Sequence, residues 1–163
     1  MLLDKELHTL NLVILPFHSV LQYGTIFSGN STHVHQVFKL QKRLVGVMSG
    51  VGPRFSCRSF FRTLNILPNA CQYIYSLMLF IVDNQKDFLT NACVHGWDTR
   101  NKNHLSIPVV SLSCVQKGVS YSGIKIFNSI PRNIKSNRNE MKRFKDNLYR
   151  HLIVHSFIQL LNF

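Results

Sequence analysis

Acidic side chains are scarce in this sequence. Seven Asp and Glu residues stand against nineteen Lys and Arg, which gives a formal net charge of +12. No two aspartates are neighbours, so the carboxylate pair that two-metal phosphoryl transfer needs is missing. We therefore expect no catalytic residues and no enzymatic activity, and the charge balance favours a polyanionic partner.

Motifs that hold metals or phosphate-bearing cofactors are also missing. No C-x-x-C occurs, and the spacing of Cys93 and His95 relative to His104 or Cys114 fits neither a zinc finger nor a zinc knuckle. The glycine-rich stretch 46–52 lacks the G-K-[S/T] ending of a phosphate-binding loop and is more typical of a helix end. We expect no metal, no cofactor and no small-molecule substrate.

Long hydrophobic runs are absent too. The apolar run 10–17 contains Pro16, is too short to span a bilayer and is followed by no cleavage pattern, while the run 77–82 is shorter still. We therefore expect an intracellular protein with reduced cysteines, without distinguishing nucleus from cytoplasm. Charge alone does not separate nucleic acid from a membrane surface, or from a solvated face that has no partner. Of these we favour nucleic acid and expect no membrane partner.

Apolar residues at helical spacing are plentiful. The spacing predicts helices over 32–48, 56–64, from 68 to about 84, over 119–130 and over 137–152. The fold class expected is mainly α, a small helical bundle with a loop-rich extended segment around 85–118. The expected divisions are listed here in order: a poorly ordered start at 1–16, a helical region at 17–84, an extended linker at 85–118, a C-terminal helical extension at 119–155 and a divergent tail at 156–163.

Several finer features are expected within these segments. Four apolar residues of 32–48 should face the core, and the opposite side should carry Lys39, Lys42, Arg43 and Gly46; the four apolar residues are Val37, Leu40, Leu44 and Met48. Helical spacing is also kept by Tyr121, Ile124, Phe127 and Ile130, and an amphipathic helix is marked by Met141, Phe144, Leu148 and Leu152. A first helix should end at Gly24, and Pro68 should occupy a first helical position. Asn137 and Glu140 have the spacing of a capping box, and 107–112 is a candidate short strand.

Basic residues gather in two places. Lys39 to Arg62 contains six of them and no acid, and 132–150 contains seven with two acids. Aromatic residues alternate with the first group, a mixture that suits stacking on bases and pairing with phosphates, although Phe60, Phe61 and Tyr73 are more typical of a core. The residues expected to contact nucleic acid are Lys39, Lys42, Arg43, Arg54, Arg58, Arg62, Lys142 and Arg143.

A set of short motifs runs through residues 17–155. They are Leu21-Gln22-Tyr23-Gly24, Leu40-Gln41-Lys42-Arg43, Ser56-Cys57-Arg58 with Phe60-Phe61, Asn65-Ile66-Leu67-Pro68, Gln116-Lys117-Gly118-Val119 and Phe127-Asn128-Ser129-Ile130-Pro131. In this order they closely resemble the C-terminal part of reverse transcriptases from jockey-like non-LTR retrotransposons.

The resemblance implies a fragment of an RNA-directed DNA polymerase. In that family the palm, with its paired catalytic aspartates, precedes this region, and a helical thumb and a C-terminal extension hold the template and primer. The expected partner is therefore RNA or an RNA/DNA duplex. Ser28 stands where the family usually has Trp, and the tail at 156–163 diverges. Two readings follow: a noncatalytic module that binds nucleic acid without sequence preference, or a transposon relic that does not fold independently.

Overall fold

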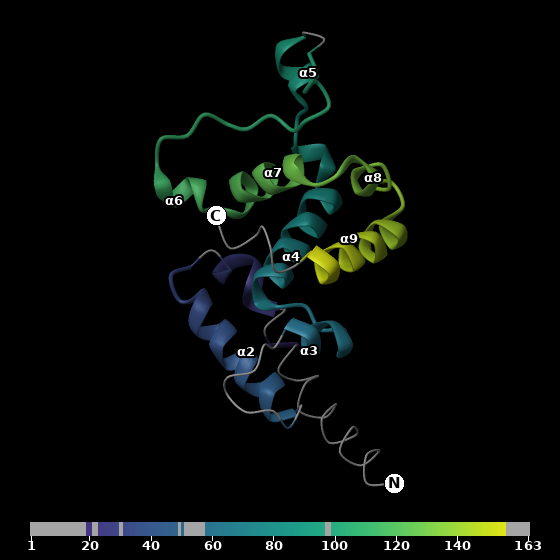
Figure 1. The fold of residues 1–163 in the computed structure, drawn as a ribbon. Helices are drawn as coiled ribbons and strands as arrows, with labels where there is room; N and C mark the ends of the chain where they lie inside the picture. The colour runs from purple at the N-terminus through teal and green to yellow at the C-terminus, as the bar shows by residue number, and fades with distance from the viewer. Residues whose placement is uncertain are drawn as a thin grey trace. The chain divides into compact units, whose positions relative to one another are not determined.

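The computed structural model describes residues 19–20, 23–29, 31–48, 50, 58–96 and 99–155 (Figure 1). Within these residues the regular structure is helical, apart from one isolated antiparallel bridge between Thr90 and Leu105. The prediction of a mainly α fold is confirmed. The expected start at 1–16, the tail at 156–163 and Arg54 lie outside the described residues.

The helices of the described residues follow the predicted segments, with ends that move by a few residues. Their bounds are α2 Val34–Met48, α3 Arg58–Thr63, α4 Asn69–Asp83, the 3₁₀ helix η1 Gln85–Asp87, α5 Asn91–His95, α6 Ser113–Gln116, α7 Val119–Ser129, α8 Arg132–Lys135 and α9 Met141–His155. Residues 23–28 are also helical. Among its described residues the 85–118 segment contains short helices, loops and the Thr90–Leu105 bridge. The strand expected at 107–112 is wrong, because no neighbouring strand of the described chain pairs with it.

The chain forms two compact units. Unit 1 comprises residues 1–73 and 152–163, and unit 2 comprises residues 74–151. The helices α4 and α9 therefore each contribute residues to both units.

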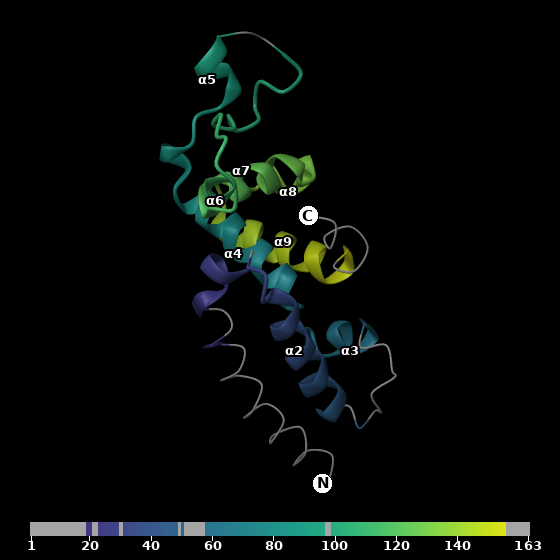
Figure 2. The ribbon, with the colours of Figure 1, turned by 90° about the vertical axis from the view of Figure 1, so that its left-hand side faces the viewer.

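The described core of unit 1 joins α2 to α3. Val45 of α2, Phe61 of α3 and Ile66 form a buried cluster, against which Phe60 and Leu64 pack. Figures 1 and 2 show α2 and α3 side by side from both directions. The predicted packing role of the α3 aromatic residues is confirmed.

The turn after α3 uses a left-handed residue to reach α4. Asn65 has a φ of 52°, and its N–H donates to the carbonyl of Arg62 at 3.1 Å. The N–H of Ile66 donates to the carbonyl of Phe61 at 2.9 Å. Together these bonds form a Schellman motif, whose usual apolar contact is supplied here by Ile66 and Phe61.

In unit 2, α7 packs closely on α4. A Cβ added to Gly123 of α7 would lie 3.0 Å from the side chain of Ile81, so glycine permits the close approach. Of the four residues at helical spacing in 119–130, Ile124, Phe127 and Ile130 are buried and Tyr121 is half-buried. The α9 residues Phe144 and Leu148 are buried as well, as predicted.

Asn128 ties α7 to the long loop before it. Its side-chain Oδ1 accepts a hydrogen bond from the N–H of Leu105, and its Nδ2 donates to the carbonyl of Leu105, both at 2.9 Å. The amide thus pairs with both the N–H and the carbonyl of one residue, as the opposite residue of a β-ladder would. This explains why Leu105 is buried within a segment that is otherwise largely exposed.

Three expected helix ends are wrong. The 23–28 helix continues past Gly24 and turns at Gly29, whose N–H donates to the carbonyl of Thr25. Pro68 precedes α4, and its carbonyl accepts the bond from Gln72. Glu140 does not occupy the third helical position that a capping box requires. Its own carbonyl accepts the hydrogen bond from the N–H of Phe144 at the start of α9, so it is itself the residue that precedes the helix.

Candidate nucleic-acid interface

The orientation of α2 differs from the one the apolar spacing predicted. Leu40 is 53% exposed, whereas Gln41 and Val45 are each 3% exposed. The predicted inward stripe is therefore wrong at Leu40, and the inward face is rotated toward Gln41. Nothing is described for the side chain of Met48.

Gln41 is buried because its amide joins α2 to the start of α4. Its Nε2 donates to the carbonyl of Leu67 at 2.9 Å, and its Oε1 accepts from the N–H of Asn69 at 2.9 Å. The second bond satisfies one of the N–H groups that every helix leaves unpaired at its first turn. Hydrophobic periodicity alone does not reveal such a residue, since a glutamine in a helix is usually exposed.

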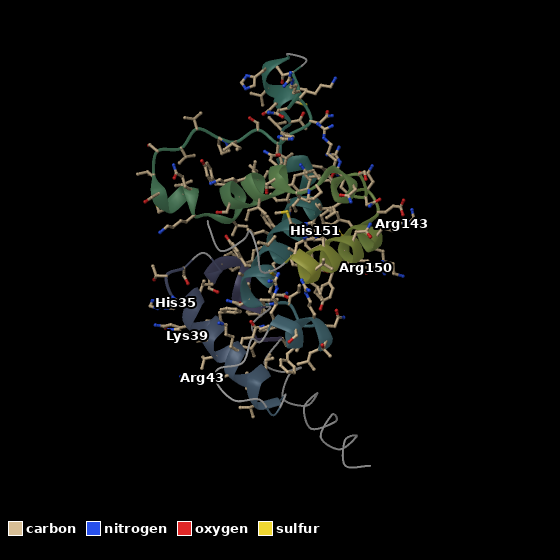
Figure 3. All side chains as sticks on the ribbon, viewed as in Figure 1. His35, Lys39, Arg43, Arg143, Arg150 and His151 are labelled. Carbon is tan, nitrogen blue, oxygen red and sulfur yellow. The ribbon has the colours of Figure 1, made fainter. Side chains whose placement is uncertain are left out.

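With Gln41 facing inward, the opposite face of α2 is cationic. Lys39, Lys42 and Arg43 are exposed, and the prediction that they lie opposite the core is confirmed. His35, which the sequence reasoning missed, lies four positions before Lys39, and Arg43 lies four after it. Figure 3 shows these three side chains following one another along α2. From His35 to Arg43 the helix rises by about 12 Å along its axis. We call His35, Lys39, Lys42 and Arg43 the α2 basic face.

The stretch of sequence around the α2 basic face contains no acidic residue. No Asp or Glu occurs from Leu7 to Val82, so the described part of unit 1 holds no carboxylate side chain. The ammonium of Lys42 lies 4.8 Å from the centre of the Phe38 ring, a contact that leaves its positive charge in place. The positive potential of this face is therefore not offset by any side chain of the described part of its own unit.

The predicted arginines of the next segment are placed differently. Arg54 lies outside the described residues. Arg58 begins α3 and is half-buried. Arg62 is exposed, and its Nη2 donates to the carbonyl of Val154 at 2.6 Å, in the last turn of α9. A cation at that position also complements the negative end of the helix dipole, which gives Arg62 a structural role.

The second predicted surface belongs to unit 2. Lys142 and Arg143 are exposed on α9, and Figure 3 marks Arg143 and Arg150 on that helix. The guanidinium of Arg143 pairs with Glu140, with an Nε to Oε2 distance of 3.0 Å. Asp146 is exposed on the same helix. Part of the positive charge of α9 is thus locally offset, unlike that of α2.

Most of the aromatic residues near the arginines are packed. Phe61 and Tyr73 are buried, as the core reading predicted. Tyr75 meets Tyr149 edge to face, with ring centres 5.8 Å apart. Burial raises the pKa of both tyrosines, and the charge of Asp146 adds to the effect on Tyr75. Tyr75 is therefore occupied by an internal contact.

The part of the chain that the structure describes contains no group of three or more His, Cys, Asp or Glu side chains that could hold a metal ion. Cys71, Cys93 and Cys114 are not joined in disulfide bonds. No helix there combines the length and apolar character needed to cross a bilayer.

The fold and this surface together define a class, a mainly α protein that carries an acid-free basic helix face. Comparison with known proteins adds no closer assignment, since no family model, no curated protein and no solved structure matches the chain.

Proposed function

We propose that this chain is a noncatalytic nucleic-acid-binding module, derived from the region that follows the palm of a jockey-like non-LTR reverse transcriptase. The observation that carries the proposal is the α2 basic face. It includes three exposed Lys and Arg residues, and the described part of its unit has no carboxylate side chain. Its partner is RNA or an RNA/DNA duplex, and phosphates are the groups it contacts.

Two of the segments that carry the family resemblance meet in the fold. Gln41 belongs to the Leu40–Arg43 motif, and it bonds to Leu67 within the Asn65–Pro68 motif and to the next residue, Asn69. These two motifs therefore contact each other within unit 1. This supports reading them as parts of a single inherited fold.

The proposed binding has little preference for nucleic-acid sequence. Lysine and arginine contacts to phosphates position a protein on nucleic acid but read no bases. The α2 face carries no exposed Asn, Asp or Glu that would pair with base edges, and its one exposed amide is Gln36. The module would hold a strand or a duplex without selecting its sequence.

A salt titration tests the proposal. Binding of the full chain to a fluorescent RNA/DNA duplex is followed by anisotropy at several salt concentrations. Three to five phosphate contacts predict that log affinity falls against log salt with a slope of about −3 to −5. An affinity that stays constant between low and moderate salt would exclude binding through phosphates.

The alternative reading is a relic that does not fold independently. It is favoured by apolar side chains that remain exposed on α2, Leu40 and Val47. In a polymerase such a surface would pack against a neighbouring domain. Thermal unfolding, described below, separates this reading from the proposed one.

A further inference from the structure

Two aromatic residues of unit 1 are largely exposed. Tyr23 and Phe27 lie four positions apart in the 23–28 helix and are 92% and 82% exposed. Residues four apart in a helix share a face, so the two rings are neighbours. Thr25, two positions from each, is buried, which turns the packed side of the helix away from both rings.

The end of the 23–28 helix nevertheless packs against α4. The N–H of Gly29 donates to the carbonyl of Thr25 at 2.8 Å and ends the helix. Gly29 itself lies flat against the ring of Tyr73 in α4, so closely that an added Cβ would overlap the ring. The exposed rings are thus attached to a helix whose end contacts α4.

The same end of α4 also holds the α2 basic face. Tyr73 contacts Gly29. Asn69, one turn earlier in α4, donates its N–H to the side-chain oxygen of Gln41 in α2. Both attachments lie within unit 1. The exposed rings and the cations therefore belong to one body rather than to two independent segments.

Exposed rings combined with exposed cations define a particular ligand chemistry. An apolar protein partner needs the rings but gains nothing from an acid-free basic surface, whereas a duplex uses the cations but keeps its bases stacked. A single strand uses both, because its phosphates pair with cations while its unpaired bases stack on aromatic side chains. We propose that Tyr23 and Phe27 form a base-stacking platform, which makes single-stranded nucleic acid the preferred ligand of the α2 basic face. This inference rests on the proposed function.

The test compares two probes with matched variants of the full chain. The probes are a fluorescent single-stranded oligonucleotide of about 12 nucleotides and an RNA/DNA duplex of the same length. The variants are the double substitution Tyr23→Ala with Phe27→Ala, and Val20→Ala as the control. Val20 is exposed three positions before Tyr23 but is aliphatic. Circular dichroism checks that the variants keep the helical content of the parent.

The double variant should lose single-strand affinity by about tenfold for each ring, while its duplex affinity stays within about twofold of the parent. Val20→Ala should bind both probes as the parent does. The variant Tyr23→Trp with Phe27→Trp should restore single-strand binding, since tryptophan also stacks.

Two results would overturn the inference while leaving the proposed function intact. One is that the double variant binds the single strand, and the duplex, with the same affinity as the parent. The other is loss, in the double variant, of a self-association seen by sedimentation, with single-strand binding unchanged; the rings would then form a protein contact. Failure of the parent to bind either probe would instead remove the proposed function, and this inference with it.

Discussion

At the scale of single residues, a buried glutamine sets the geometry of the candidate interface. Gln41 makes two hydrogen bonds to the backbone on either side of Pro68, and both Leu67 and Asn69 are themselves buried. Its amide therefore fixes the rotation of α2 about its own axis. The cations point outward because this polar side chain points inward.

Replacing Gln41 with leucine should be strongly destabilising. The carbonyl of Leu67 and the N–H of Asn69 would both remain buried without their partner, at a cost of about 2–4 kcal/mol in the free energy of unfolding. Gln36→Leu, on the exposed face of the same helix, should change it by less than about 0.5 kcal/mol. Urea denaturation measures both, and equal effects would contradict the proposed role of Gln41.

A second residue-scale prediction concerns His104. Burial, helped by the positive charges of Lys135 and Arg132, lowers the pKa of His104 below its ordinary value. The unfolded chain therefore binds a proton at this imidazole more readily than the folded chain does. The contribution of His104 to stability is present above its unfolded pKa of about 6.5 and is lost as the pH falls through the lower folded pKa.

His104→Gln should accordingly reduce the loss of stability on acidification. The measurement is the midpoint of urea unfolding at about pH 8 and about pH 5.5, for the parent and the variant. A variant that loses stability on acidification as much as the parent would show that His104 does not contribute.

At the scale of elements, the sequence predicts where helices lie better than it predicts how they are oriented. The long helices, the inward residues of α7 and the outward cations of α2 all follow from apolar spacing. The exposure of Leu40 does not, because a polar residue with two backbone partners took the inward position. The pairing of Asn128 with Leu105 is equally invisible to periodicity, since it joins residues far apart in the chain.

The end of α3 offers a test of element geometry. Asn65 adopts the left-handed conformation, which costs residues with a Cβ about 1–2 kcal/mol and costs glycine almost nothing. Asn65→Val should therefore destabilise the protein by about 1 kcal/mol or more, whereas Asn65→Gly should be close to neutral. Thermal melts compare the two. A valine variant as stable as the glycine variant would be inconsistent with the left-handed turn.

At the scale of the whole molecule, the excess of positive charge acts on folding and on binding in opposite senses. A net charge of +12 produces self-repulsion that salt screens. The two units share α4 and α9, so loss of either helix disturbs both units. We therefore expect one cooperative unfolding transition whose midpoint responds to ionic strength.

Raising the ionic strength from about 0.01 M to about 0.15 M shortens the screening length from about 30 Å to about 8 Å. The melting temperature followed by circular dichroism should rise over this range, while nucleic-acid affinity should fall. A broad, noncooperative loss of helix at every salt concentration would favour the relic that does not fold independently.

The most direct test of the central claim removes equal charge from two surfaces. One variant carries Lys39→Gln, Lys42→Gln and Arg43→Gln on α2, and the other carries Lys142→Gln, Lys145→Gln and Arg150→Gln on α9. Each loses three exposed positive charges. In salt titrations with the RNA/DNA duplex, the α2 variant should bind with a slope shallower by about 2–3, and the α9 variant should keep most of the parent slope. Equal slopes for the two variants would contradict a specific role for the α2 basic face.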